Sequence, residues 1–176
     1  MNLLLFTARD RLDGKHIRVV DRRLQHLLEV HGAQPGDTLR VGELGGQMGE
    51  AIIVDIDTDH ALLSVTLDTP APAKLPLSLV LALPRPKMLR RILRAVAEFG
   101  LAELHLINSY RVEKSYWQTP ALEPDTVQDY LLLGLEQARD TVLPTVQYHR
   151  RFKPFVEDEL PAMVAGRTCV ALPEGS

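Results

Sequence analysis

Cysteine is nearly absent from this sequence, and other residues that commonly build active sites are sparse. The single cysteine, Cys169, excludes an internal disulfide. It lies in an apolar run, which predicts a buried structural thiol and fits a reducing compartment. The six histidines show no metal-ligand spacing, so with one cysteine we expect no metal site.

Several sequence motifs are also missing. There is no GxGxxG, no Walker A loop, no HExxH and no serine nucleophile elbow, which argues against phosphate-loop, zinc-peptidase and serine-hydrolase chemistry. No apolar run is long enough to span a bilayer, and the start MNLLLF reaches charged residues too early for a signal peptide. We therefore expect a cytoplasmic protein with no membrane partner.

A surplus of positive charge is lacking as well. The net charge of -3 argues against a general polyanion binder, for which a basic surplus is usual. The charge is uneven, however, because residues 85–94 hold five cations and no anion. Any nucleic-acid role must rest on this local patch.

The stretch from residue 77 to residue 114 organises the rest of the chain. Leu77–Leu83 is a continuous apolar run, typical of a buried strand, and Leu104–Ile107 is a second one. Between them we expect a helix that begins at Met88 and ends at Gly100. Strand, helix and strand with a short return predict a βαβ unit in a parallel sheet.

One face of the expected helix carries only cations. Lys87, Arg90, Arg91 and Arg94 recur at helical spacing, and Arg85 precedes them. These five residues are called the basic strip. Like charges one turn apart cost about 0.3 kcal/mol per pair, so an unrelieved row favours an anionic ligand, with phosphate backbone the leading candidate. A solvated helix surface is the alternative.

Two polar groups lie at the ends of other elements. Asn108–Lys114 follows the second strand, and its Arg111 and Lys114 are suited to grip phosphates, while Tyr110, Tyr116 or Trp117 could stack on an unpaired base. Glu136–Asp140 ends a long helix that we expect to begin at Asp125. Arg139 there also suits the helix dipole, so a purely structural role is the alternative.

The fold class we predict is α/β, preceded by a small barrel. Residues 1–70 show five short strands and one helix capped by Asp21, a pattern typical of a barrel. Three prolines in residues 70–76 indicate a stiff connector, and we place the linker at 71–76. Residues 77–176 form the α/β domain, which continues with a strand at Val146–Tyr148, a helix at Phe155–Val164 and a closing strand at Thr168–Leu172.

These motifs, in this order, resemble the RsmE family of methyltransferases, which methylate N3 of a uridine in small-subunit (16S) ribosomal RNA. The resemblance covers essentially the whole chain. It is carried by His26 with Glu29-Val30, Gln34–Asp37, Leu83–Arg91, Glu98–Gly100, Ser109–Arg111 and Glu136-Gln137 with Pro144 beyond. It implies a PUA-like RNA-binding barrel and a SPOUT domain whose deep trefoil knot binds S-adenosylmethionine. It also implies a homodimer with the active site formed across the two copies.

The resemblance implies roles for individual residues. Arg111 and Arg139 are expected to orient the uridine or to stabilise its anionic form during catalysis, and no residue is an obvious general base. The residues expected to bind the ribosomal RNA, or the small ribosomal subunit, are Arg85, Lys87, Arg90, Arg91, Arg94, Lys114, His26 and Arg40.

The chain departs from the family pattern most clearly near its end. The family's cofactor loop, Gly-Pro-Glu-Gly-Gly, and its later knot segment are not found before Ser176. We interpret Thr168–Leu172 as the first knot strand, which makes Leu172 and Pro173 the expected cofactor-binding residues and the SPOUT domain incomplete. Such a chain is expected to bind the cofactor poorly. A non-catalytic module that binds ribosomal RNA is therefore the alternative function.

Overall fold

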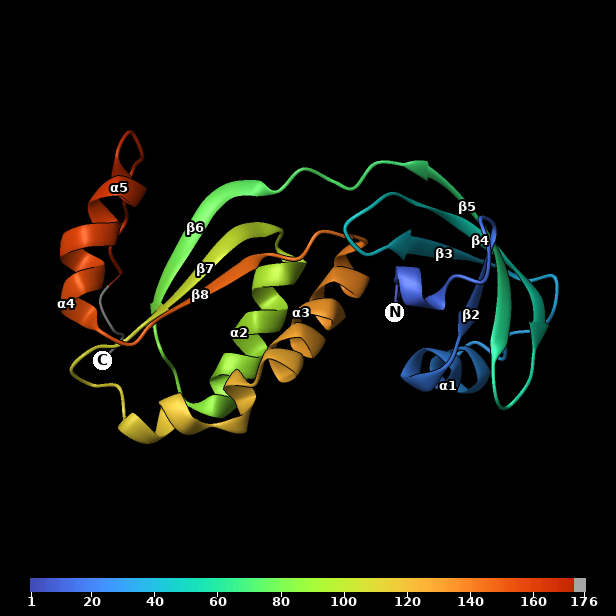
Figure 1. Ribbon diagram of the computed structural model, residues 1–176, viewed down its shortest axis with the longest axis horizontal. Coiled ribbons are helices and arrows are strands. Elements are labelled where there is room, and N and C mark those ends of the chain that lie inside the picture. The colour runs from blue at the N-terminus through green and yellow to red at the C-terminus, as the bar shows by residue number, and fades with distance from the viewer. Residues whose placement is uncertain (173–176) are drawn as a thin grey trace.

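A computed structural model describes residues 1–172 and divides them between two β-sheets at opposite ends of an elongated molecule (Figure 1). The N-terminal sheet has the strand order β1-β3-β4-β5-β2. Its strands are β1 (Leu4–Phe6), β2 (His16–Val19), β3 (Thr38–Glu43), β4 (Met48–Ile56) and β5 (Ala61–Thr69). The sheet curls around a core to which α1 (Asp21–Glu29) contributes, as the prediction of a small barrel with one helix requires.

The curled sheet follows the two-residue period of β-structure. On β3, Leu39 and Val41 pack in the core, whereas Arg40 between them is exposed. On β4, Ala51 is buried in the same core and Glu50 is exposed. The outer face of the sheet is mixed in character, because Ile52 and Val54 of β4 are 51% and 47% exposed.

The C-terminal sheet consists of the parallel strands β6 (Leu75–Ala82), β7 (Leu101–Ile107) and β8 (Thr145–His149), in that order. α2 (Pro86–Glu98) connects β6 to β7, and α3 (Pro124–Ala138) precedes β8. Both helices cover the same face of the sheet (Figure 1). This confirms the predicted βαβ unit and the α/β class. The short turns are η1 (Ala8–Asp10), η2 (Lys114–Gln118) and η3 (Pro120–Leu122).

Strand β1 is buried on both of its faces. Leu4 and Phe6 belong to the core of the curled sheet, while Leu3 and Leu5 pack into the second core beside α2 and α3. A strand covered on both faces shows no polar alternation, which explains the apolar run at the start of the sequence. β1 therefore joins the two cores.

Three predicted boundaries are wrong by a few residues, and a proline lies at each of them. α2 and α3 begin at Pro86 and Pro124, not at Met88 and Asp125. Proline suits the first helical position because the N–H that it lacks would have no partner there. β6 begins at Leu75, inside the predicted linker, and tolerates Pro76 because β6 is an edge strand.

A helical segment packs against the C-terminal sheet at the end far from the curled sheet (Figure 1). It comprises α4 (Phe152–Pro154), the π-turn η4 (Phe155–Glu159) and α5 (Leu160–Val164), so the predicted helix at Phe155–Val164 is confirmed. Phe155 is fully buried, and its ring lies 4.4 Å from that of His149. His149 also contacts Glu159 at 3.3 Å and His105 of β7 at 3.0 Å. These contacts hold the segment to the sheet.

The predicted closing strand at Thr168–Leu172 is wrong. Residues 168–172 form no strand, and Val170 and Leu172 are 79% and 87% exposed. The C-terminal sheet has two edge strands, β6 and β8, but residues 168–172 pair with neither of them, and apolar composition alone does not establish such pairing. Cys169 is likewise exposed rather than a buried thiol, because the run around it enters no core. Within residues 1–172, no helix has the length and hydropathy needed to cross a membrane.

Candidate nucleic-acid interface

The carboxyl-terminal ends of the three parallel strands lie side by side, because Ala82, Ile107 and His149 are paired in register. The segments that follow these strands therefore meet at one edge of the sheet, where parallel α/β sheets hold their ligands. Each segment contributes two exposed cations. We call these six residues the edge cations: Arg85, Lys87, Arg111, Lys114, Arg150 and Arg151.

The basic strip has no counter-ions in the part of the chain that the structure describes. All five of its side chains are exposed, and none of them takes part in an ion pair there. Other cations behave differently, because four of them lie 2.6–2.8 Å from a carboxylate: Arg11, Arg22, Arg23 and Lys74. The fold thus pairs its structural cations and leaves the strip open, which favours an anionic ligand over a merely solvated surface.

The three aromatic candidates near the edge cations differ in their availability. Tyr110 is fully exposed, while Tyr116 packs against the core. The indole N–H of Trp117 donates to Asn108 at 3.3 Å, and the guanidinium of Arg150 lies 5.6 Å from the Trp117 ring. Tyr110 is therefore the side chain best placed to stack on an unpaired base. The sequence reasoning did not single out Arg150 and Arg151, although their position directly after a predicted strand could have indicated them.

The two predicted catalytic arginines lie at opposite ends of the C-terminal sheet. Arg111 follows the carboxyl end of β7, whereas Arg139 caps the end of α3 that leads into β8. The 15 residues of α3 span about 22 Å at 1.5 Å per residue. A single chain therefore does not bring Arg111 and Arg139 to one nucleotide.

Arg139 instead shares a cavity with Arg40, a predicted RNA-binding residue of the curled sheet. The cavity has a volume of about 580 Å³. It is lined by residues of β3, β4 and β5, together with Leu3 and Arg139. Neither arginine side chain has a hydrogen-bond or ion-pair partner among the described residues. The structure thus places in one cavity two residues for which the sequence predicted different roles.

His26, another predicted RNA contact, lies partly buried on α1. Its Nε2 atom is buried and has no hydrogen-bond partner within residues 1–172, and its ring lies 5.0 Å from that of His31. Burial, followed by the positive charge of the N-terminal amine, lowers the pKa of His26. A neutral imidazole can offer RNA a hydrogen bond but not a cation at neutral pH.

The Glu136-Gln137 pair holds the two sheets together. Both carboxylate oxygens of the buried Glu136 accept hydrogen bonds from Arg22 of α1, at 2.6 and 3.0 Å. The backbone amide of Asn2 donates to the Glu136 carbonyl, and the Asn2 side chain donates to the Gln137 carbonyl. Thr141 adds a hydrogen bond of 2.6 Å to the Gly46 carbonyl. These contacts support the structural role that the sequence left as an alternative for this cluster.

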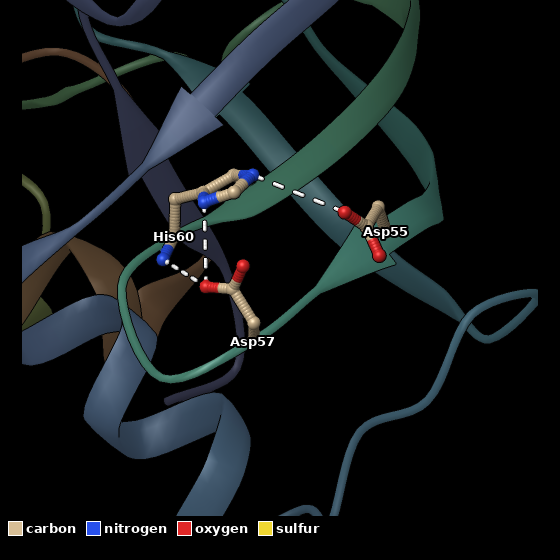
Figure 2. Close-up of side chains that lie close together, drawn as sticks. All are labelled: Asp55, Asp57 and His60. Atoms are coloured by element: carbon tan, nitrogen blue, oxygen red, sulfur yellow. Dashed lines mark hydrogen bonds and ion pairs between the residues drawn. The ribbon is translucent and has the colours of Figure 1, made fainter.

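The turn between β4 and β5 brings Asp55, Asp57 and His60 together (Figure 2). One Asp57 oxygen accepts the backbone amides of Asp59 and His60 at 2.7 and 2.9 Å and lies 3.3 Å from the His60 ring. These hydrogen bonds within the turn account for the arrangement, and both aspartates are exposed. We assign no metal to this group.

The predicted cofactor residues fall at the end of the described chain. The side chain of Leu172 is 87% exposed, so it does not line an enclosed pocket. Pro173 lies outside the described residues. Residues 1–172 therefore do not supply a cofactor site around Leu172.

Comparison with known proteins gives a consistent set of relatives. The chain is 32% identical over 158 residues to Ribosomal RNA small subunit methyltransferase E of Treponema pallidum, an alignment that covers 88% of this chain and 59% of that protein. A probable rRNA-methyltransferase from Porphyromonas gingivalis has a similar fold, with a TM-score of 0.67, 20% identity, and coverage of 88% of this chain and 63% of that one. A Ribosomal RNA small subunit methyltransferase E from Neisseria gonorrhoeae, solved bound to S-adenosyl methionine, has a TM-score of 0.60 and 15% identity, and covers 83% of this chain and 62% of that one.

The chain spans only about 60% of the length of these relatives. The RNA methyltransferase domain model matches residues 71–174, which is more than half of the chain. On that match, this chain belongs to the RNA methyltransferase domain family.

Proposed function

We propose that the protein methylates N3 of a uridine in small-subunit ribosomal RNA, with S-adenosylmethionine as the methyl donor. The observation that carries this proposal is the unpaired basic strip beside the edge cations, in a chain of the RNA methyltransferase domain family. Residues 1–70 would hold RNA through the curled sheet, 71–76 would connect, and 77–176 would form the methyltransferase domain. The relative named Ribosomal RNA small subunit methyltransferase E supports small-subunit ribosomal RNA as the substrate.

The chemistry sets requirements that the chain's own residues can meet in part. Uridine N3 carries a proton, so methylation there requires its removal, and negative charge then develops on the two flanking carbonyl oxygens. A guanidinium that donates to one of these oxygens stabilises that charge. Arg111, among the edge cations, is our candidate for this role. Arg139 would reach the same uridine only from a second copy of the chain, as in the homodimer that we propose.

The nucleotide must also be accessible. N3 of a paired uridine is engaged in the base pair, so the target has to be unstacked or single-stranded. Tyr110 is fully exposed next to Arg111 and offers a surface on which a neighbouring base can stack. The basic strip and Lys114 would hold the phosphates on either side. We propose the small ribosomal subunit as partner and the cytoplasm as location.

One observation favours the alternative of a non-catalytic RNA-binding module. Residues 1–172 present open cations, yet the predicted cofactor residue Leu172 is exposed instead of enclosed. RNA binding and cofactor binding by this chain therefore have to be measured separately.

A methyl-transfer assay tests the proposal. Protein made from the complete reading frame that encodes this chain is incubated with small ribosomal subunits and S-adenosylmethionine labelled in the methyl group, and the RNA is digested to nucleosides. We expect the label in 3-methyluridine. Label in a different nucleoside refutes the assigned position, and RNA binding without any transfer supports the module.

A further inference from the structure

The cavity that contains Arg40 and Arg139 lies between the curled sheet and the end of α3. Its barrel side is formed by β3, β4 and β5 and is mostly polar but includes Met48 and Ile52, and its other side includes Leu3 and Arg139 at the end of α3. Besides the two arginines, the lining offers hydroxyl groups from Ser64, Thr66 and Thr69 and carboxylates from Glu50 and Asp68. We call this cavity the cleft.

Both arginines in the cleft keep their hydrogen-bonding capacity. Arg40 is paired in register with Glu50 on the neighbouring strand, but the two side chains form no ion pair. Arg139 is exposed, and no described side chain or carbonyl accepts from its guanidinium. Each guanidinium can therefore offer two parallel N–H donors to an anion with two acceptor oxygens, such as a phosphate.

The backbone of Arg139 is held in an unusual conformation. Its φ and ψ angles of 57° and 51° are left-handed, a region in which glycine is the usual residue at the end of a helix. The neighbouring Asp140 fixes this turn, because its amide donates to the Leu135 carbonyl at 3.0 Å and its carboxylate pairs with Lys74 at 2.7 Å. Backbone geometry alone therefore favours glycine at position 139, and it gives no reason for a long cationic side chain.

We propose that the cleft binds the sugar-phosphate backbone of single-stranded RNA, with Arg40 and Arg139 each contacting a phosphate. This inference rests on the proposed function and adds a second contact region to it, separate from the basic strip. The carboxylates of Glu50 and Asp68 are acceptors suited to the ribose 2′-hydroxyl, the group that distinguishes RNA from DNA. RNA in the cleft would contact both the curled sheet and the end of α3, so the curled sheet alone would not reproduce its affinity.

Binding of a fluorescein-labelled oligouridylate of about 15 nucleotides, measured at several salt concentrations, tests the proposal. The variants are Arg40→Gln, Arg139→Gly and the two combined. Each phosphate contact on a single strand contributes about 0.7 to the slope of log affinity against log salt. We expect each single variant to lower the slope by about 0.7 and the double variant by about 1.4. The control is Lys153→Gln on α4, which removes one exposed cation at the far end of the molecule and should leave the slope unchanged.

A second measurement separates binding from folding. Arg139→Gly removes the left-handed strain, so its thermal midpoint should equal or exceed that of the wild type while its RNA affinity falls. A lower midpoint in Arg139→Gly, together with wild-type RNA affinity in the uncharged variant Arg139→Gln, would show a structural role and overturn the proposal.

The outcomes also separate this proposal from the proposed function. If the cleft variants bind like the wild type while Arg90→Ala with Arg94→Ala weakens binding, the cleft proposal fails and the function stands. If the wild-type chain binds no RNA, both proposals fail. The ratio of RNA affinity to DNA affinity tests the ribose contacts in the double variant Glu50→Gln with Asp68→Asn. A ratio equal to that of the wild type would refute these contacts.

Discussion

Glu136 shows how a single buried residue joins the two sheets. Its side chain is 4% exposed, and both of its oxygens are bound by Arg22, whose own side chain is 48% exposed. Glu136→Ala should lower the free energy of unfolding by about 2 kcal/mol, less than for a fully buried pair, because Arg22 can turn to water. Urea denaturation measures this loss. Glu98→Ala, at an exposed end of α2, is the matched control, and an equal loss in both variants would contradict the account.

Asp10 makes stability depend on acid. Burial raises its pKa, but hydrogen bonds from Arg23 and from the Thr7 amide outweigh burial, so the pKa of Asp10 lies below its ordinary value. A carboxyl with a lowered folded pKa stabilises the fold above its unfolded value of about 4, and this contribution disappears as the pH falls through the folded pKa.

The test for Asp10 is the difference in unfolding free energy between the wild type and Asp10→Asn. This difference should be largest near pH 6 and shrink steadily as the pH falls below about 4. A difference that stays constant down to pH 2 would mean that the Asp10–Arg23 pair does not cause the loss of stability in acid.

Arg111 carries the catalytic part of the proposal. Arg111→Ala should reduce the single-turnover rate of methyl transfer by about 100-fold, the usual effect of losing one donor to a developing oxyanion. RNA affinity should fall only by the small amount expected for one lost cation. A rate change no larger than the affinity change would reassign Arg111 to RNA binding alone.

At the scale of elements, the contact between α2 and α3 depends on Gly134. A β-carbon at this position would collide with the backbone carbonyl of Arg94 and lie 2.7 Å from the β-carbon of Ala97. Replacing a helix glycine by alanine normally gains about 1 kcal/mol of helix propensity. Here Gly134→Ala should instead lower the free energy of unfolding by about 1–3 kcal/mol, because two backbones must separate.

Chemical denaturation of Gly134→Ala checks this prediction. Gly14→Ala is a suitable control, because nothing lies within 4 Å of a β-carbon placed there. A Gly134→Ala protein as stable as the wild type would show that the two helices can move apart at little cost.

The elements that could be predicted from the sequence are those specified by a local pattern. The βαβ unit follows from two apolar runs around an amphipathic helix, and its basic strip is exposed as expected. The strand expected at Thr168–Leu172 does not form, because these residues do not come into register with an edge strand, and no local pattern reveals that. The contact between Arg150 and the ring of Trp117, in the segment after β7, could not be predicted either, because it depends on the pairing register of β7 and β8.

At the scale of the whole molecule, the placement of sites depends on topology. Arg111 and Arg139 are 28 positions apart in the sequence. Helix α3 lies between them and runs along the sheet, so the two arginines lie at opposite ends of it. Their separation follows from the direction of α3 relative to β7, which residue types do not encode. Arg139 and Arg40 line one cavity although they are far apart in the sequence, and β1 contributes side chains to both cores on either side of it.

The open cations of the basic strip are the part of the molecule that we most clearly expect to bind RNA. The most direct test compares the wild type with Arg90→Ala and Arg94→Ala combined, by measuring affinity for a single-stranded small-subunit rRNA fragment against salt concentration. We predict that the double variant weakens binding and lowers the salt slope by about 1.4, whereas Lys153→Gln on α4 changes it far less. An unchanged slope in the strip variant would contradict the account.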